Sequence, residues 1–472
     1  MLKLLIKNGT VVTANETFKA DIGITEEKIS HIAVAGGLDT MIAEGETEVI
    51  DASGKYVMPG LIEPHMHVKA PFSGTIDILD FYSASKCAAF GGVTTFMDFS
   101  TTTQDTPVME AVAERIEEMS EGALDYSVHA KFIKASTHLR EDIKKLVDDG
   151  IPTFKMFTIY PGVMIPDADI LRIMEIAKEE GALCGFHAES NAIAEFMKEK
   201  LLSEGKTDWE YFNQAKPNVC EAEAVTRILA FAELLDAPVY FYHLSTKEAV
   251  ELVRQAKKRG VNVQAETCGH YLVFTDEKNK GKDGINYLMS PPLRSKEDQD
   301  ALWEGIQDGT LSLVTSDNEI FTRAIKEKDL HVDPKSGEKI PNFTVPVNGI
   351  PGLEERFGLL MRGVNEGRIS INKLVEVGST NPAKVFGCYP EKGCLEVGSD
   401  ADIIIVDPEK TVSLTQKNLH YTDDGTLDYD LYKDMEAKGR PVCTIRRGEI
   451  LVKNEEFYGT KGSGKFLKRH LD

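Results

Sequence analysis

The sequence predicts an α/β fold, a (β/α)8 TIM-like barrel with a small β-sandwich domain built from both chain ends. Apolar strand-like runs alternate with helix-like runs through the middle of the chain, a pattern typical of parallel sheets. Both ends consist instead of short strand-like runs separated by turn residues. Several strands of the middle region end in His or Asp, as expected where a barrel gathers its chemistry at one mouth.

The first part of the sandwich is expected within residues 1–56. The predicted strands lie at 2–6, 11–13, 21–24, 29–34 and 48–51, and the expected turns at 8–9, 26–27 and 36–37. Residues 386–454 have the same character and are expected to complete the sandwich, with strands at 401–408, 442–445 and 449–452. Residues 455–472, rich in Lys and Gly, are expected to form a C-terminal extension.

The barrel is expected within residues 57–385. Its eight strands are predicted at 60–67, 93–99, 126–133, 153–157, 182–187, 239–243, 261–266 and 311–317. Helices are predicted at 107–121, 167–180, 220–235 and 246–259, the first with Thr106 as N-cap and Pro107 in its first turn. A doubly wound open sheet is the alternative, but no Gly-x-Gly-x-x-Gly follows the first strand.

Composition restricts the possible partners and the compartment. The formal net charge of -22 argues against nucleic acid or an anionic membrane as the main partner. The seven cysteines contain no Cys-x-x-Cys pair and suit free thiols in a reducing compartment. No apolar run is long enough to span a bilayer, and residues 1–7 are too short and too charged for a signal peptide. We therefore expect a cytoplasmic protein.

Histidines and one aspartate predict a metal site. His65 and His67 lie one residue apart, so on a strand both imidazoles face the same side. By themselves they fit a pair of partly buried histidines equally well. His187, His243 and Asp317, however, also end separate strand-like runs. Imidazole and carboxylate donors at one barrel mouth suit zinc first, with manganese, iron or cobalt as alternatives.

Lys155 lies between apolar neighbours on a predicted barrel strand, where a charged ammonium is costly to bury. A lysine that extends to the strand end and reaches water is the ordinary interpretation. Close to metal ligands, however, a neutral lysine can add carbon dioxide and become a carbamate, a carboxylate able to bridge two cations.

Eight short motifs extend this pattern along nearly the whole chain. They are PGLIEPHMH at 59–67, PFSGT at 71–75, GGVTT at 91–95, FKMFTIY at 154–160, ETC at 266–268, SPPLR at 290–294, NGIPG at 348–352 and GSDAD at 398–402. In this order, the chain resembles the hydantoinase/dihydropyrimidinase family of cyclic amidohydrolases. The resemblance implies hydrolysis of a ring amide or ureide C–N bond, opening hydantoins or dihydropyrimidines to N-carbamoyl amino acids.

The resemblance also implies a binuclear metal centre with a bridging hydroxide. His65, His67 and Asp317 would hold one ion, His187 and His243 the other, and a carboxylated Lys155 both. A hydroxide between two divalent ions is available near neutral pH for attack on the ring carbonyl. Asp317 would then carry the proton to the departing ring nitrogen.

The implied substrate contacts come from four residues. Tyr160 matches the tyrosine that donates to the developing oxyanion. Ser290 and Asn348 match positions whose backbone groups hold the cyclic amide. Lys69 occupies the place of the arginine with which dihydroorotases grip a substrate carboxylate, and we expect it either to favour anionic rings or to lie in solvent.

Three departures from the family pattern leave alternatives open. Glu63 stands where an Asp is common, Asn318 follows Asp317 where His is usual, and His270 resembles the allantoinase version of its segment. Allantoinase and dihydroorotase are therefore the rival enzymes. A non-catalytic scaffold homologue is opposed by the complete set of metal ligands. Relatives of this kind are commonly homotetramers, so the resemblance implies a homo-oligomer, a tetramer or a dimer.

Overall fold

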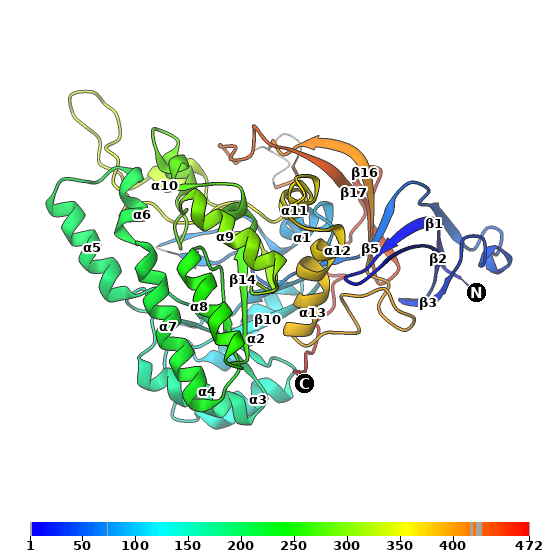
Figure 1. The fold of residues 1–472 in the computed structure, drawn as a ribbon, viewed down its shortest axis with the longest axis horizontal. Coiled ribbons are helices and arrows are strands. Elements are labelled where there is room, and N and C mark those ends of the chain that lie inside the picture. The colour runs from blue at the N-terminus through cyan, green and yellow to red at the C-terminus, as the bar shows by residue number, and fades with distance from the viewer. Residues whose placement is uncertain (1, 73, 416–418, 422–426, 472) are drawn as a thin grey trace.

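The barrel is present in the computed structural model, which describes residues 2–72, 74–415, 419–421 and 427–471. Its eight parallel strands are β6 (Leu61–Glu63), β9 (Val93–Phe99), β10 (Asp125–Lys131), β11 (Thr153–Phe157), β12 (Leu183–His187), β13 (Val239–Phe241), β14 (Val263–Cys268) and β15 (Leu313–Thr315). They neighbour one another in chain order from β6 to β15. The predicted fold class is therefore confirmed (Figure 1).

The barrel closes just beyond the ends of β6 and β15. The His67 amide donates to the Asn318 carbonyl at 2.8 Å, and the Asp317 amide donates to the His65 carbonyl at 2.9 Å. Met66 and Asn318 form a parallel bridge between these two hydrogen bonds. The segments that carry three proposed ligands are thus also the segments that close the barrel.

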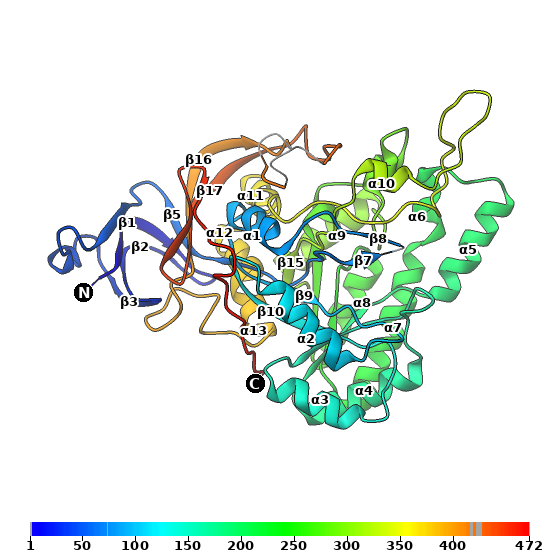
Figure 2. The ribbon, with the colours of Figure 1, turned by 180° about the vertical axis from the view of Figure 1, so that it is seen from behind.

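Helices cover the outside of the barrel (Figures 1 and 2). The principal ones are α1 (Phe81–Phe90), α2 (Val108–Met119), α3 (Leu139–Asp148), α4 (Asp167–Glu179), α7 (Asn218–Leu235), α8 (Lys247–Lys258), α9 (Lys296–Gln307) and α11 (Arg356–Asn365). In α8, Val250 and Val253 are buried, and the Thr246 hydroxyl accepts a hydrogen bond from the Ala249 amide at the N-terminus. Helical spacing of apolar residues and a capping side chain therefore orient this helix on the sheet.

Smaller elements lie around this frame. They are β7 (Pro71–Phe72), β8 (Thr75–Ile76), α5 (Asn191–Ser203), α6 (Phe212–Ala215), α10 (Arg323–Glu327), α12 (Ile371–Val375) and α13 (Asn381–Val385). Of the PFSGT motif, Ser73 lies outside the described residues.

The sandwich-like domain is built from both chain ends, as predicted. Its nine-stranded sheet runs β19-β18-β17-β16-β5-β1-β2-β3, with β4 also paired to β1. The first half supplies β1 (Leu4–Val12), β2 (Thr17–Thr25), β3 (Lys28–Ala33), β4 (Glu48–Asp51) and β5 (Tyr56–Pro59). The second supplies β16 (Ile403–Ser413), β17 (Glu436–Arg446), β18 (Glu449–Lys453) and β19 (Glu456–Phe457). The boundaries assigned above to the domains stay predictions.

Two local predictions are wrong. The Asn8-Gly9 pair is not a turn between two strands but a bulge inside β1, where Asn8 takes a positive φ of 62° and donates its amide to Asp21 at 2.8 Å. Asn tolerates this left-handed conformation, so the strand continues. In α2, Pro107 rather than Thr106 holds the N-cap position, and no side chain caps the helix there.

The last residues lie against the barrel. Arg469 is fully buried, and its guanidinium donates to the Ser127 hydroxyl at 2.8 Å and to the Val128 carbonyl at 2.6 Å. Among the described residues, no helix combines the length and apolar character needed to cross a bilayer.

Candidate metal centre and active site

His65 and His67 lie beyond the end of β6 rather than on it, since the strand stops at Glu63. Their rings still turn toward one site, with centroids 5.4 Å apart. Both Nε2 atoms approach the same Asp317 oxygen, at 3.0 Å from His65 and 3.4 Å from His67. Two imidazole nitrogens and a carboxylate oxygen at these distances form a set of donors that one cation can bind.

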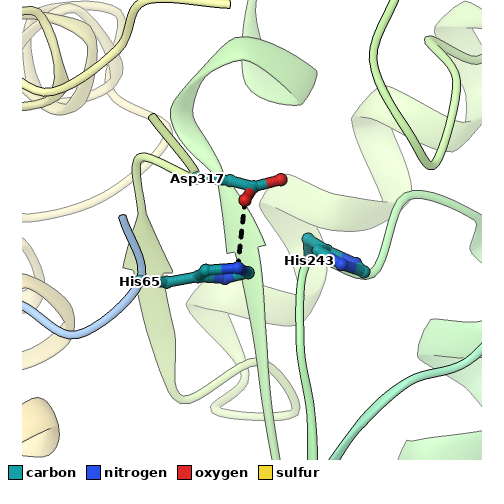
Figure 3. A group of neighbouring side chains, drawn as sticks. All are labelled: His65, His243 and Asp317. Carbon is teal, nitrogen blue, oxygen red and sulfur yellow. Dashed lines mark ion pairs between the residues drawn. The ribbon is translucent and has the colours of Figure 1, made fainter. Parts of the chain in front are cut away.

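Asp317 reaches this position because the chain turns sharply after β15. Its φ is +47°, a left-handed conformation that few residues other than Gly adopt. His243, after β13, has a φ of +39°. Figure 3 shows the side chains of Asp317, His65 and His243 converging from three separate segments. Backbone strain at two of the three positions is typical of functional sites.

Glu266 orients His65 from behind. This buried carboxylate on β14 accepts a hydrogen bond from His65 Nδ1, and its other oxygen accepts from the Tyr240 hydroxyl at 2.5 Å. Holding the proton on Nδ1 leaves Nε2 free to act as a metal ligand. Burial lowers the pKa of His65, but Asp317 and Glu266 outweigh it and raise the pKa to about 9, so a cation bound at Nε2 would displace a proton.

His187 and His243 face each other with ring centroids 4.4 Å apart. His187 Nε2 contacts the Glu189 carboxylate at 2.7 Å, which leaves Nδ1 for another partner. His243 Nδ1 is buried and has no hydrogen-bond partner among the described residues. Burial, together with His187, holds the pKa of His243 well below its usual range, so this ring stays neutral and able to bind a metal.

Lys155, on β11, is 1% exposed, and its Nζ lies 3.4 Å from His65 Nε2. Its ammonium sits 3.7 Å from the centre of the Tyr242 ring, and no carboxylate of the described chain lies within ion-pair distance. Burial lowers the pKa of Lys155 to about 8. A minor share of neutral amine, which carbamate formation requires, is therefore present near neutral pH.

These residues fit a metal site on chemical grounds. Donor atoms of His65, His243 and Asp317 all lie within 4.8 Å of one another. The unsatisfied Nδ1 of His243 is a buried donor atom that the protein alone does not use. A second acidic group, Asp125, Asp400 and Asp402, is instead occupied by the Lys392 ammonium, 2.6 Å from Asp125 and 2.8 Å from the other two.

Tyr160, Ser290 and Asn348 line one cavity of about 160 Å³ together with Lys155, His67, His187, His243 and Asp317. Pockets for drug-sized ligands are commonly about 300–1,000 Å³, so this one favours a small ring. The Asn348 side-chain amide lies 3.5 Å from the Ser290 hydroxyl, and its carbonyl oxygen is buried without a partner in the described part of the chain.

Lys216 joins these residues and was not among the sequence-predicted ones. Its Nζ donates to the Tyr160 hydroxyl at 3.0 Å, to the Ser290 hydroxyl at 2.7 Å and to Glu189 at 2.8 Å. Burial raises the pKa of Glu189, but Lys216 and His187 outweigh it and lower the pKa to about 2. Lys216 thus connects Tyr160 and Ser290, which line the cavity, to Glu189, which contacts His187.

Lys69 does not join the other residues that were predicted to bind substrate. It lies outside the set that lines the cavity, and its Nζ is 3.7 Å from Glu121, with both side chains more than one-third exposed. A φ of +49° takes the chain out of the extended conformation on which the same-face argument rested. Its role in substrate binding stays a prediction.

The three departures from the family pattern have structural consequences. The Glu63 carboxylate lies 3.3 Å from Arg356 and accepts from the His65 amide at 3.0 Å, so it fixes the strand end. Asn318 closes the barrel through its backbone, and its side-chain oxygen accepts from the Gly352 amide at 3.2 Å. His270 is 2% exposed, lies outside the cavity lining and has no hydrogen-bond partner on either ring nitrogen among the described residues.

Comparison with known proteins places this site in a family. Residues 56–451 match the family described as "Amidohydrolase family". The chain belongs to the amidohydrolase family. This amidohydrolase is 38% identical to the D-hydantoinase of Ralstonia pickettii and 36% identical to that of Geobacillus stearothermophilus, over 99% and 98% of its length and 99% and 96% of theirs. It superposes on the crystal structure of dihydropyrimidinase from Brevibacillus agri NCHU1002 with a TM-score of 0.92 at 36% identity, covering 100% of this chain and 99% of that one.

The resemblance read from the motifs is therefore confirmed at the family level. Two residues of the site, Glu266 and Lys216, were not predicted from the motifs that predicted the metal ligands. Glu266 is part of the ETC motif, but its hydrogen bond to His65 forms only because the barrel brings their two segments together. Lys216 follows a helix outside any quoted motif, and only the fold brings it to Tyr160.

Proposed function

We propose that this amidohydrolase opens the ring C–N bond of a hydantoin or dihydropyrimidine to give an N-carbamoyl amino acid. The observation that carries the proposal is the cluster of His65, His243 and Asp317 donors beside the buried Lys155, at a cavity that suits a small ring. Relatives named D-hydantoinase align with the chain from end to end, which supports the same substrate class.

The proposed cofactor is a pair of divalent metal ions, zinc first and manganese, cobalt or iron as alternatives. His65, His67 and Asp317 would hold one ion and His187 and His243 the other, with Lys155 shared after it has become a carbamate. His243 also has a donor atom within 4.8 Å of Asp317, although the proposal assigns these two residues to different ions, so this division rests on the family resemblance. When bound, the ions would activate water near neutral pH and polarise the ring carbonyl.

Asp317 is the proposed proton carrier. Burial raises its pKa, but the neighbouring His65 and His67 outweigh this and hold it well below its usual range, so it is an ionised acceptor. It would take a proton from the attacking water and deliver it to the ring nitrogen as the C–N bond breaks. The leaving nitrogen then departs as a neutral amide.

Tyr160 is the proposed donor to the carbonyl oxygen during attack. Lys216 contacts its hydroxyl and that of Ser290, which supports a shared orientation of both groups toward the ring. Ser290 and Asn348 would hold the amide edge of the ring. Because Lys216 is held by the buried Glu189, this arrangement is set before substrate arrives.

We also retain a homo-oligomer, a tetramer or dimer, and a cytoplasmic location as proposals. Of the rival enzymes, allantoinase gains nothing from His270, because that ring lies outside the cavity lining. Dihydroorotase activity stays an alternative, because a cationic residue, described below, is available for a substrate carboxylate.

The test is a substrate panel on protein reconstituted with zinc or with manganese. Hydantoin, dihydrouracil, allantoin and dihydroorotate would be compared by chromatographic detection of the ring-opened product, with metal content measured on the same sample. We expect about two ions per chain and turnover of hydantoin or dihydrouracil. Full activity with one ion or none would contradict the binuclear proposal, and inactivity on all four rings would contradict the function.

A further inference from the structure

A second lysine lies beside Lys155 at the barrel mouth. Lys131, the last residue of β10, is the registered partner of Lys155 on β11. In a parallel sheet, registered neighbours direct their side chains to the same face. Lys131 accordingly lines the same cavity as Lys155, His67 and Asp317.

The Lys131 ammonium has no structural partner among the residues that the structure describes. Its backbone amide donates to the Ser100 hydroxyl at 2.8 Å, but no hydrogen bond or ion pair involves Nζ in that part of the chain. Two buried lysines away from this cavity have partners: Lys326 Nζ donates to the Gly349 carbonyl at 2.7 Å, and Lys392 contacts three carboxylates. A largely buried cation that is left unpaired at a cavity wall is available to a ligand.

A fixed guanidinium lies on the same wall, where the Glu118 carboxylate, 3.0 Å from Arg115 Nη1, offsets part of its charge. Arg115 lines the cavity, and it is held by hydrogen bonds from Nε to the Phe99 carbonyl at 3.0 Å and from Nη1 to the Val68 carbonyl at 2.8 Å. Burial, with Arg115 acting in the same direction, lowers the pKa of Lys131 to about 8. Lys131 therefore still carries its charge in most molecules at pH 7. Glu319 also lines the cavity, but it forms no ion pair with Lys131 within 4 Å.

We propose that Lys131 binds an anionic substituent of the ring, so that the preferred substrates are cyclic ureides or imides bearing a carboxylate. This inference rests on the proposed function and narrows it to a substrate class. The small cavity limits the substituent to a short one, such as a carboxymethyl group. Lys131 takes the part that the sequence assigned to Lys69, which points away from the cavity toward Glu121.

The test compares two rings that differ only in charge, 5-carboxymethylhydantoin and its carboxamide. With zinc-reconstituted wild type, we expect a higher kcat/KM for the carboxylate, mainly through a lower KM. Lys131→Met should reduce the ratio of the two kcat/KM values about 10- to 100-fold, the range for loss of one charged hydrogen bond. Lys131→Arg should keep most of the ratio. Lys134→Met is the matched control, since this exposed lysine follows three residues later and its Nζ contacts the Gln104 carbonyl.

A binding readout separates recognition from catalysis. The ring-opened products of the two probes should inhibit wild type unequally, the carboxylate more strongly, and Lys131→Met should remove the difference while zinc content stays unchanged. Equal inhibition and equal kcat/KM for both probes in wild type would overturn the proposal without any variant. An equal loss of kcat/KM for both probes in Lys131→Met would also overturn the proposal. Lys131 would then act on Glu319 or Lys155 rather than on the substituent. If wild type opens neither probe nor hydantoin, the proposed function itself fails.

Discussion

Replacing Lys216 by methionine tests whether the cation behind Tyr160 holds the site together. The change keeps most of the side-chain length but removes three hydrogen bonds, at 2.7 to 3.0 Å, to Ser290, Glu189 and Tyr160. Glu189 is fully buried, and one of its oxygens already has no partner among the described residues. Without Lys216, its charge would be balanced only by the contact with His187.

The expected loss of folding stability in Lys216→Met follows from the buried Glu189 carboxylate. Removing one partner of a buried ion pair costs about 3–5 kcal/mol. The pKa of Glu189 is about 2 rather than 4.5, and this lowering corresponds to about 3 kcal/mol of stabilisation from Lys216 and His187 after the opposing effect of burial. Because the pKa is lowered in the folded protein, this contribution is complete above pH 4.5 and is lost as the pH falls toward 2. The deficit of Lys216→Met should therefore be largest near neutral pH.

The assay is urea denaturation at neutral pH and fixed zinc, followed by fluorescence and compared through the free energy of unfolding. Lys145→Met is the control, since Lys145 pairs with Asp149 at 2.9 Å on the surface and should cost less than about 1 kcal/mol. Adding Glu189→Gln to Lys216→Met removes the uncompensated charge and should recover part of the loss. A cost no greater than that of the control, or a double variant whose loss equals the sum of the two single losses, would refute the reasoning.

Four further predictions concern the metal site and one buried acid. Lys155→Ala should lose metal and activity together, and short carboxylic acids should restore part of both; unchanged metal content and turnover would make Lys155 a purely structural residue. Tyr160→Phe should lower kcat about 100-fold or more with a smaller change in KM, as measured by steady-state kinetics, whereas an effect on KM alone would indicate a binding role only. Chelation should lower the thermal midpoint and added zinc should restore it, since a ligand that binds only the folded state stabilises it; a midpoint insensitive to chelator would contradict a resident metal. Burial raises the pKa of Glu355 to about 8, so wild type should lose stability relative to Glu355→Gln as the pH rises from 4.5 to 8, by up to about 1.4 kcal/mol per pH unit, and parallel pH profiles in urea would exclude this.

The sequence could predict the strands whose ends form the barrel mouth. β9 and β11 begin and end where predicted, because all their residues except Asp98 and Lys155 are apolar or Thr, as is typical of buried strands. Two strands were predicted too long at their histidine ends, since β6 stops before His65 and β13 before His243, whereas β12 ends at His187 as predicted. The apolar pattern of the sequence continues past the last hydrogen bond between neighbouring strands. It therefore cannot show at which residue a strand ends and the turn that carries a ligand begins.

The residues that support the ligands could not be predicted in the same way. Glu266 and Lys216 act through contacts with residues far along the chain, at 201 and 56 positions from His65 and Tyr160. Lys131 lies inside the predicted strand 126–133, and only its register with Lys155 brings it to the same cavity. The same-face argument does not apply to Lys69, because Lys69 itself has a positive φ, and its role in substrate binding stays a prediction.

The first ligand-bearing strand is a direct continuation of the sandwich sheet, and this has a consequence for biosynthesis. β5 ends at Pro59, the Gly60 amide donates to the Asp402 carbonyl at 2.9 Å, and β6 begins at the next residue. The same edge of β5 pairs with β16, where Val57 faces Ile405. A nascent chain therefore emerges from the ribosome with His65 and His67 long before the strand that anchors them exists. A chain that stops short of β16 would keep every proposed ligand yet lack this support for His65 and His67, so stable metal uptake should follow the synthesis of β16.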